Sequence, residues 1–150
     1  MNTVPFFLTA FIVIGLLAPE KGASPSPSPS VPGVRIERIR FDAPGVDGRT
    51  NRSLNGEWVE VGNRSGKTRN LRGWRLRGAG GQAYVFKDLR LRPGQTVRVH
   101  TGSGRDGRGH LYWRRGTHAW RNSGSTVRLS SPAGRADSCG WRSRGTVKRC

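Results

Sequence analysis

The chain has 150 residues, with 27 Lys and Arg against 9 Asp and Glu, and a formal net charge of +18. This length leaves room for one domain with a modest core, and the 22 Gly and 9 Pro are typical of a turn-rich chain, so a two-domain enzyme, a coiled coil, a polytopic membrane protein and a disulfide-dense knot are excluded. The charge predicts polyanionic partners, such as nucleic acid, acidic wall polymers or anionic lipid.

Residues 1–23 are predicted to be a signal peptide or an N-terminal anchor. Residues 4–18 are almost wholly apolar, but a membrane-spanning helix needs about 20 residues. The run suits the apolar region of a secretory signal. The alternative that the run is an uncleaved membrane anchor remains, because no Lys or Arg precedes the run and no clean cleavage site follows it. We expect a secreted or cell-envelope protein in which the Ser/Pro-rich residues 24–33 form a spacer.

A series of about eight short strands is predicted from residue 34 onward, at intervals of roughly ten residues. The segments that alternate apolar and polar residues are 34–41, 56–61, 71–77, 84–86, 89–91, 96–99, 111–113, 126–129 and 135–138. The alternation breaks at Glu37-Arg38, which indicates a β-bulge. No apolar pattern beyond residue 33 predicts a helix of more than two turns. Strand spacing alone fits a β-sandwich or a β-barrel.

Several segments also carry family motifs. They are LNGEWVEV at 54–61, LRGWRL at 71–76, YVF at 84–86, LRPGQTVRVHTG at 91–102, LYW at 111–113 and WRNSGS at 120–125. In this order and spacing they resemble the lamin tail domain over about residues 34–139. The resemblance implies an all-β, immunoglobulin-like β-sandwich of the bacterial exported branch, similar to accessory binding modules without catalytic residues. Animal relatives bind DNA and protein partners.

The chain departs from this family in the closing motif. Arg121 and Ser125 stand where the family usually has Asn and Asp, which makes this loop more basic. Beyond the resembling region, residues 140–150 are interpreted as a basic C-terminal tail. Cys139 and Cys150 are the only cysteines, and in an exported chain such a pair predicts a disulfide.

No catalytic, cofactor or metal site is predicted. His100, His110 and His118 lack a metal-ligand spacing and are interpreted as surface residues at strand ends and in a loop, although two of them can approach across the glycine-rich loop. Acidic residues are too few for a two-carboxylate hydrolase, and no Gly-x-Ser-x-Gly motif is present. We therefore expect that the protein is not an enzyme.

The five tryptophans have separate interpretations. Trp58 and Trp74 lie in strand motifs and are expected in the core. Trp113 is expected to be mostly buried, and Trp120 to be a packed anchor of a basic loop. An alternative is that an aromatic ring between these arginines stacks on a base or a sugar. For Trp141, which lies between the two cysteines, the sequence favours neither a core position nor a surface position.

A distributed arginine surface is the candidate binding site. Strand alternation and loop position predict that its members face outward, and they are Arg75, Arg77, Arg98, Arg114, Arg115, Arg121 and Arg128. The tail adds Arg142, Arg144, Lys148 and Arg149. The predicted function is an exported, non-catalytic module that contacts extracellular nucleic acid or anionic wall polymer. The alternative is a structural or protein-interaction module of the envelope, whose Arg excess reflects the codon bias of a G+C-rich genome.

Overall fold

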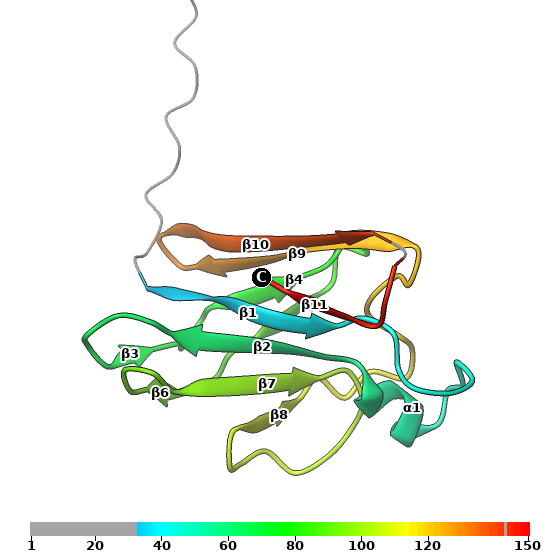
Figure 1. Cartoon of the computed structure of the whole chain (residues 1–150). Helices are drawn as coiled ribbons and strands as arrows, with labels where there is room; N and C mark the ends of the chain where they lie inside the picture. The colour runs from blue at the N-terminus through cyan, green and yellow to red at the C-terminus, as the bar shows by residue number, and fades with distance from the viewer. Residues whose placement is uncertain (1–32, 143) are drawn as a thin grey trace, which may run out of the picture.

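The computed structural model describes residues 33–142 and 144–150. The predicted signal peptide or anchor, residues 1–23, lies outside the described residues. So does the predicted spacer, except for Gly33. The described part forms two β-sheets packed face to face (Figure 1). The predicted all-β, immunoglobulin-like β-sandwich is therefore confirmed. Strand spacing alone also fitted a barrel, and the two separate sheets exclude that alternative. Within the described ranges, no helix has the length and apolarity to cross a membrane.

The first sheet has five strands in the order β11-β1-β2-β7-β8. These strands are β1 (Val34–Arg40), β2 (Trp58–Asn63), β7 (Thr96–His100), β8 (His110–Tyr112) and β11 (Val147–Arg149). All neighbours are antiparallel except β7 and β8, which run parallel. The register between β1 and β2 shifts between Ile36 and Arg38, so the predicted bulge is confirmed.

The second sheet has four antiparallel strands in the order β10-β9-β4-β5. These strands are β4 (Arg75–Arg77), β5 (Ala83–Val85), β9 (Gly124–Ser131) and β10 (Gly134–Arg142). A small separate ladder joins β3 (Arg69–Asn70) to β6 (Arg90–Leu91). The inward side chains of both large sheets form one apolar core. Its fully enclosed members include Ile36, Ile39, Val59, Val61, Leu76, Phe86, Val127 and Leu129.

The predicted strand at residues 71–77 is wrong in its first half. Only Arg75–Arg77 forms a strand, because the chain turns at Gly73, where φ is +78°. The amide of Trp74 donates to the carbonyl of Leu71 at 2.9 Å and closes this turn. Leu71 and Trp74 are both buried, although they are three residues apart and would face opposite sides of one strand. The turn, and not a continuous strand, therefore brings both side chains into the core.

The predicted start of a strand at residue 56 is also corrected. Residues up to there form the short helix α1 (Asn51–Gly56), and β2 begins at Trp58. Thr50 caps the helix, since its hydroxyl oxygen accepts from the amide of Ser53 at 3.2 Å. With six residues, α1 stays below two turns, as the lack of a longer helical apolar pattern predicts.

The predicted basic tail at residues 140–150 belongs to the folded domain. β10 continues to Arg142, and β11 pairs with β1 through three residue pairs. A disulfide joins Cys139 to Cys150, with their Cα atoms 5.7 Å apart. Cys139 is buried on β10, so this bond fastens the edge strand of one sheet to the edge strand of the other. The boundary after Cys139 is therefore too early.

Candidate functional site

The outer surface of the four-stranded sheet carries four neighbouring arginines. Arg77 lies directly opposite Arg128, and Arg75 lies opposite Ser130, whose other neighbour is Arg135. All four arginines are exposed. They line a shallow hollow together with Gly73, Ser130, Ser131 and Pro132. We call Arg75, Arg77, Arg128 and Arg135 the arginine face.

No acidic side chain neutralises the arginine face within the described ranges. None of its four guanidinium groups lies in an ion pair there. Asp137 is close in sequence, but the register shift between Arg135 and Asp137 turns it toward the other sheet, where its Oδ2 accepts from the amide of Ile36 at 2.8 Å. Like charges directly opposite one another destabilise a sheet, so the Arg77–Arg128 pair opposes folding.

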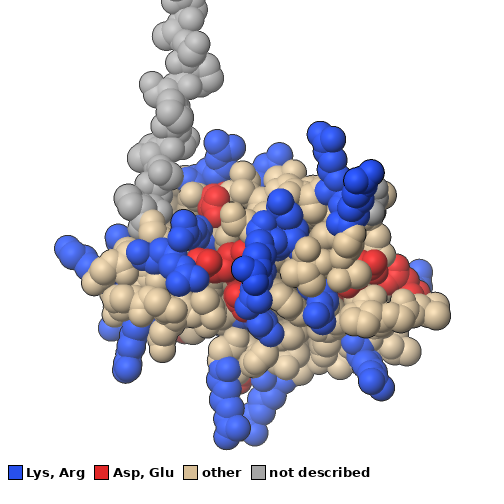
Figure 2. Space-filling view, viewed as in Figure 1, with Lys and Arg blue, Asp and Glu red and all other residues tan. Residues whose placement is uncertain are grey.

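The outer surface of the five-stranded sheet has a different electrostatic character. Glu60 contacts Arg98 at 2.7 Å and Arg38 at 2.9 Å, and Glu37 contacts Arg64 at 2.7 Å. Figure 2, with β1, β2 and β7 toward the viewer as in Figure 1, shows acidic groups between the basic ones. Burial acts to raise the pKa of Glu60, but the hydrogen bonds from Arg98 and Arg38 prevail and hold this pKa below its ordinary value. Arg98 is thus separated from the arginine face and neutralised.

Trp58 is buried, yet it lies outside the core that we predicted for it. It sits on the outer surface of β2, where the guanidinium carbons of Arg98, Arg40 and Arg38 lie 4.4, 5.5 and 5.9 Å from its ring centroid. These cations cover the ring and leave it only 7% exposed. Strand alternation settles this, because Val59 and Val61 take the inward positions of β2. Trp74 belongs to the core as predicted.

The remaining predicted arginines lie in loops. Arg114 is 3.6 Å from Asp106, and Arg115 covers Trp113 with its guanidinium carbon 5.1 Å from the ring centroid. Arg115 also donates to the side chain of Gln82. Arg121 is exposed. Of the seven predicted binding residues, the structure therefore brings together only Arg75, Arg77 and Arg128.

Three tryptophans form one packed cluster at the end of the sandwich. The ring of Trp120 lies 5.9 Å from that of Trp113 and 6.2 Å from that of Trp141, which in turn stacks on Phe41 at 5.2 Å. Trp120 is 5% and Trp141 6% exposed. Trp120 is therefore the packed anchor that we predicted. The alternative of base stacking is wrong for Trp120, since neither face of its ring is free.

The histidines take part in internal hydrogen bonds. His100 Nδ1 lies 3.0 Å from the carbonyl of Asn55, and its Nε2 lies 2.8 Å from His110 Nδ1. Because a carbonyl only accepts, His100 carries its proton on Nδ1 and accepts from His110 at Nε2. His118 contacts Glu57 at 3.0 Å. His100 ends β7 and His110 begins β8, as predicted, but all three histidines are half-buried and not fully exposed on the surface.

The described residues contain no cluster of three metal-ligating side chains. His100 and His110 meet across the glycine-rich loop, as the sequence allowed, but they bond to each other. Arg135 is the binding-face residue that sequence reasoning missed. Its signal was present, because it begins an alternating strand, but nothing in the sequence showed that β10 lies next to β9 in this register.

The two-sheet arrangement defines an immunoglobulin-like β-sandwich domain, a class in which binding is carried by surfaces and end loops. The family model described as Lamin Tail Domain matches residues 27–143, and the chain belongs to this family. Its members are non-enzymatic domains, which suggests a non-catalytic protein-interaction domain. No curated protein matches the chain.

Proposed function

We propose that this protein is an exported polyanion-binding module whose ligand is a phosphodiester polymer, either extracellular nucleic acid or an anionic wall polymer. The observation that carries the proposal is the arginine face, in which four exposed guanidinium groups share one sheet surface without a carboxylate partner among the described residues. Guanidinium groups offer paired donors in one plane, which suits phosphate oxygens. Such a ligand would relieve the repulsion between Arg77 and Arg128.

The distribution of charge favours binding over codon bias. Codon bias would add arginine without regard to the position of the acids. Instead the described ion pairs of Glu37 and Glu60 gather on the five-stranded sheet, while the four-stranded sheet keeps its arginines unpaired. Uncompensated like charge on one surface costs folding stability. A surface of this kind is typical of proteins that bind polyanions.

The ligand is expected to be recognised by its phosphates and not by its bases. No aromatic side chain lines the hollow of the arginine face, so stacking on bases has no platform there. The short helix α1 has only six residues and belongs to a different part of the fold, so no recognition helix is offered to a groove. Binding should therefore discriminate little among sequences.

The test compares binding of the full chain with that of two triple variants at several salt concentrations. Arg75→Ser/Arg77→Ser/Arg128→Ser removes three charges from the arginine face. Lys87→Ser/Arg90→Ser/Arg92→Ser, the matched control, removes three exposed charges near β6. For duplex DNA, the log–log slope of affinity against salt should be about −0.9 per phosphate neutralised, and the face variant should lose about three of these contributions. The control should lose less.

The alternative function remains a protein-interaction module with compositional charge. If the wild-type chain binds neither DNA nor inorganic polyphosphate at low salt, the polyanion proposal is overturned and this alternative stands. If both triple variants lose affinity equally, binding depends on net charge and the arginine face is not the site.

A further inference from the structure

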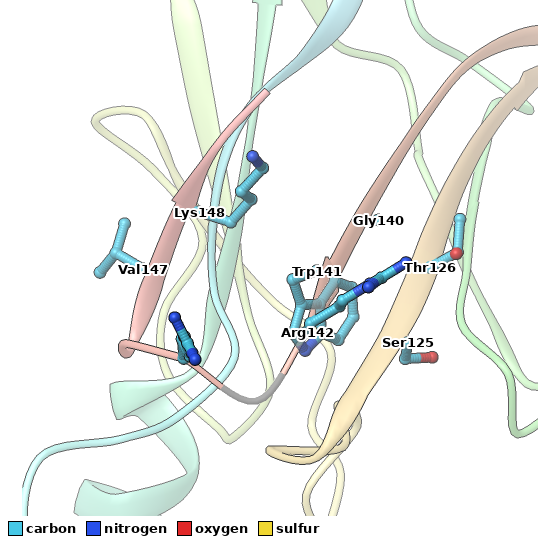
Figure 3. A pocket seen from close by; sticks show the side chains of 8 residues that line it. Ser125, Thr126, Gly140, Trp141, Arg142, Val147 and Lys148 are labelled. Atoms are coloured by element: carbon cyan, nitrogen blue, oxygen red, sulfur yellow. The ribbon is translucent and has the colours of Figure 1, made fainter.

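A second basic hollow lies at the open edge of the sandwich, between β10 and β11 (Figure 3). Three cations line it, Arg142 at the end of β10, Arg144 in the turn and Lys148 on β11. Ser125 and Thr126 of β9 add two hydroxyl groups, and Trp141 lies between the strands. We call this hollow the edge groove.

The register of β11 explains why Lys148 lines the groove. Lys148 lies directly opposite Ile39 of β1, and directly opposite residues of an antiparallel pair project from the same side of the sheet. Ile39 is fully buried in the core. Lys148 therefore projects from the inward side of its sheet, but at the edge strand, where β10 stands across an open gap. Figure 3 shows its side chain on the side of β11 that faces β10.

The groove has a rigid apolar floor. Trp141 stacks on Phe41 with an interplanar angle of 16°, and its Nε1 donates to the carbonyl of Arg121 at 2.9 Å. With its ring packed and its polar atom satisfied, Trp141 has one fixed position. Gly140 adds no side chain, so the space between β10 and β11 stays open. The floor of the hollow is thus preformed, and the ordering cost on binding falls on the exposed side chains of Arg142, Arg144 and Lys148.

The edge groove contains no acidic residue in its lining. None of its three cations forms an ion pair in the described part of the chain. The disulfide between Cys139 of β10 and Cys150, two residues after Lys148, fixes β11 to β10. It therefore holds cations from two different sheets around one space.

We propose that the edge groove is a second phosphate-binding site, and that it holds one phosphate group of the same polymer that lies on the arginine face. In this respect the inference rests on the proposed function. Thr126 lines the groove two residues along β9 from Arg128, and the groove residue Arg142 lies opposite Gly124. The separation from Arg128 to Gly124 is four residues, or about 13 Å of strand. A phosphodiester chain a few units long reaches both sites, whereas a single phosphate occupies one.

Edge strands also carry inward-pointing charges for another reason, because such charges block edge-to-edge pairing with a second chain. Lys148 alone fits that role. A charge of either sign can protect an edge strand, however, whereas a phosphate site needs a positive charge. Reversing the sign of this single charge therefore separates the two roles.

The experiment follows backbone amide NMR signals of the full chain during titration with inorganic phosphate and then with inorganic tripolyphosphate. Signals of Ser125, Thr126 and Gly140 report on the edge groove, and those of Gly73, Ser130 and Ser131 report on the arginine face. Lys148→Glu should weaken tripolyphosphate binding at the groove signals by roughly tenfold or more at low salt. Lys148→Arg should retain it. Lys87→Glu, an exposed charge reversal elsewhere, serves as the matched control.

The role of the disulfide is tested with Cys150→Ser. We expect this variant to lose the groove response while the face signals still move, because backbone hydrogen bonds then hold β11 to the β1 segment and no covalent bond holds it near β10. The affinities of a thymidine oligonucleotide and of base-free polyphosphate with the same number of phosphates are then compared, to distinguish nucleic acid from a base-free polymer as the source of the phosphates. Equal affinities indicate recognition of phosphate alone.

The outcomes for the two proposals are distinct. If the groove signals of Lys148→Glu respond to tripolyphosphate as those of the wild type do, the edge-groove proposal is overturned and edge protection explains Lys148. If the groove signals move and the face signals do not, the groove is a site but the proposed function of the arginine face fails.

Discussion

Glu57 shows how much one side chain contributes to this fold. It is only 1% exposed and stands between α1 and β2. Its Oε2 accepts from the amide of Ala119 at 3.0 Å, and its Oε1 contacts His118 Nδ1 at 3.0 Å. Burial raises its pKa above the ordinary value. Glu57 thus ties the loop that carries Trp120 to the five-stranded sheet.

Replacing Glu57 with Ala should lower the free energy of unfolding by about 2 kcal/mol, because it leaves the half-buried amide of Ala119 without this acceptor and His118 without its carboxylate partner. Glu57→Gln keeps one acceptor oxygen and should cost less. Urea unfolding followed by tryptophan fluorescence measures the difference, with the exposed Asp88→Ala as control. A cost for Glu57→Ala no larger than that of the control would contradict the structural role.

His100 gives the fold a pH dependence near neutrality. Burial lowers its pKa below the value of 6.5 expected in an unfolded chain. As the pH falls, the unfolded chain therefore binds this proton first, and the contribution of His100 to stability is present above about pH 6.5 and is lost as the pH falls toward the folded pKa. The raised pKa of Glu57 acts in the opposite sense, so a comparison of variants is needed to isolate His100.

We expect the free energy of unfolding of the wild type to fall more than that of His100→Asn between about pH 7.5 and about pH 5.5. Urea midpoints at these two pH values measure the effect. His118→Asn is a useful second comparison, since it removes a histidine whose partner is a carboxylate, that of Glu57, whereas His100 contacts a carbonyl and another histidine. Equal pH dependence in wild type and His100→Asn would show that His100 does not titrate in this range.

At the scale of elements, the edge strands decide how the domain closes. β11 has three exposed residues, and among the described strands it pairs only with β1. This is little contact for a terminal strand. β10 is nine residues long and forms the edge of the other sheet. The Cys139–Cys150 disulfide connects these two edges, and it thereby compensates for the short strand.

Cys150→Ser should lower the free energy of unfolding by a little under ~3 kcal/mol, since the bridge closes a loop with a sequence separation of 11 residues. Cys150 is exposed, so the substitution leaves the core unchanged. Thermal unfolding of the variant, of the wild type and of the wild type reduced with a dithiol provides the comparison. The variant and the reduced wild type should agree, and an unchanged stability in both would contradict a stabilising role of the bridge.

At the scale of the whole molecule, the two sheets differ in electrostatics although both are rich in arginine. Glu37 and Glu60 neutralise arginines on one surface, and the arginine face stays unneutralised on the other. The ion pairs on the first surface stabilise the fold, whereas the like charges on the arginine face destabilise it. Salt weakens both the attraction and the repulsion, and at a net charge of +18 the repulsion should dominate.

The free energy of unfolding should therefore rise when sodium chloride increases from about 0.02 M to about 0.3 M, over which the screening length shortens severalfold. The Arg75→Ser/Arg77→Ser/Arg128→Ser variant should show a smaller rise, because its like-charge contacts are already removed. Urea unfolding at both salt concentrations gives the two slopes. A fall in wild-type stability with salt would mean that the ion pairs around Glu60 outweigh the arginine face.

Local patterns in the sequence determined most of the strands. Alternation located β1 with its bulge, β7, β9 and the start of β10, because period-two patterning reports which side of one strand is buried. The resemblance of the motifs to the lamin tail domain predicted that these strands form a β-sandwich. The same patterning placed Arg75, Arg77 and Arg128 on an outer surface. It failed at Gly73, where a turn keeps two apolar residues buried, and at α1, whose six residues are too few for a helical period.

Only the tertiary structure decided which outward residues are neighbours. The sequence places Arg98 outward just as it places Arg128, but strand order puts them on opposite sheets and gives Arg98 a carboxylate partner in Glu60. It also turned the expected tail into a strand, so that Lys148 stands across from Arg142. The physical reason is that sheet order and register are set by contacts between distant segments, which no local period records.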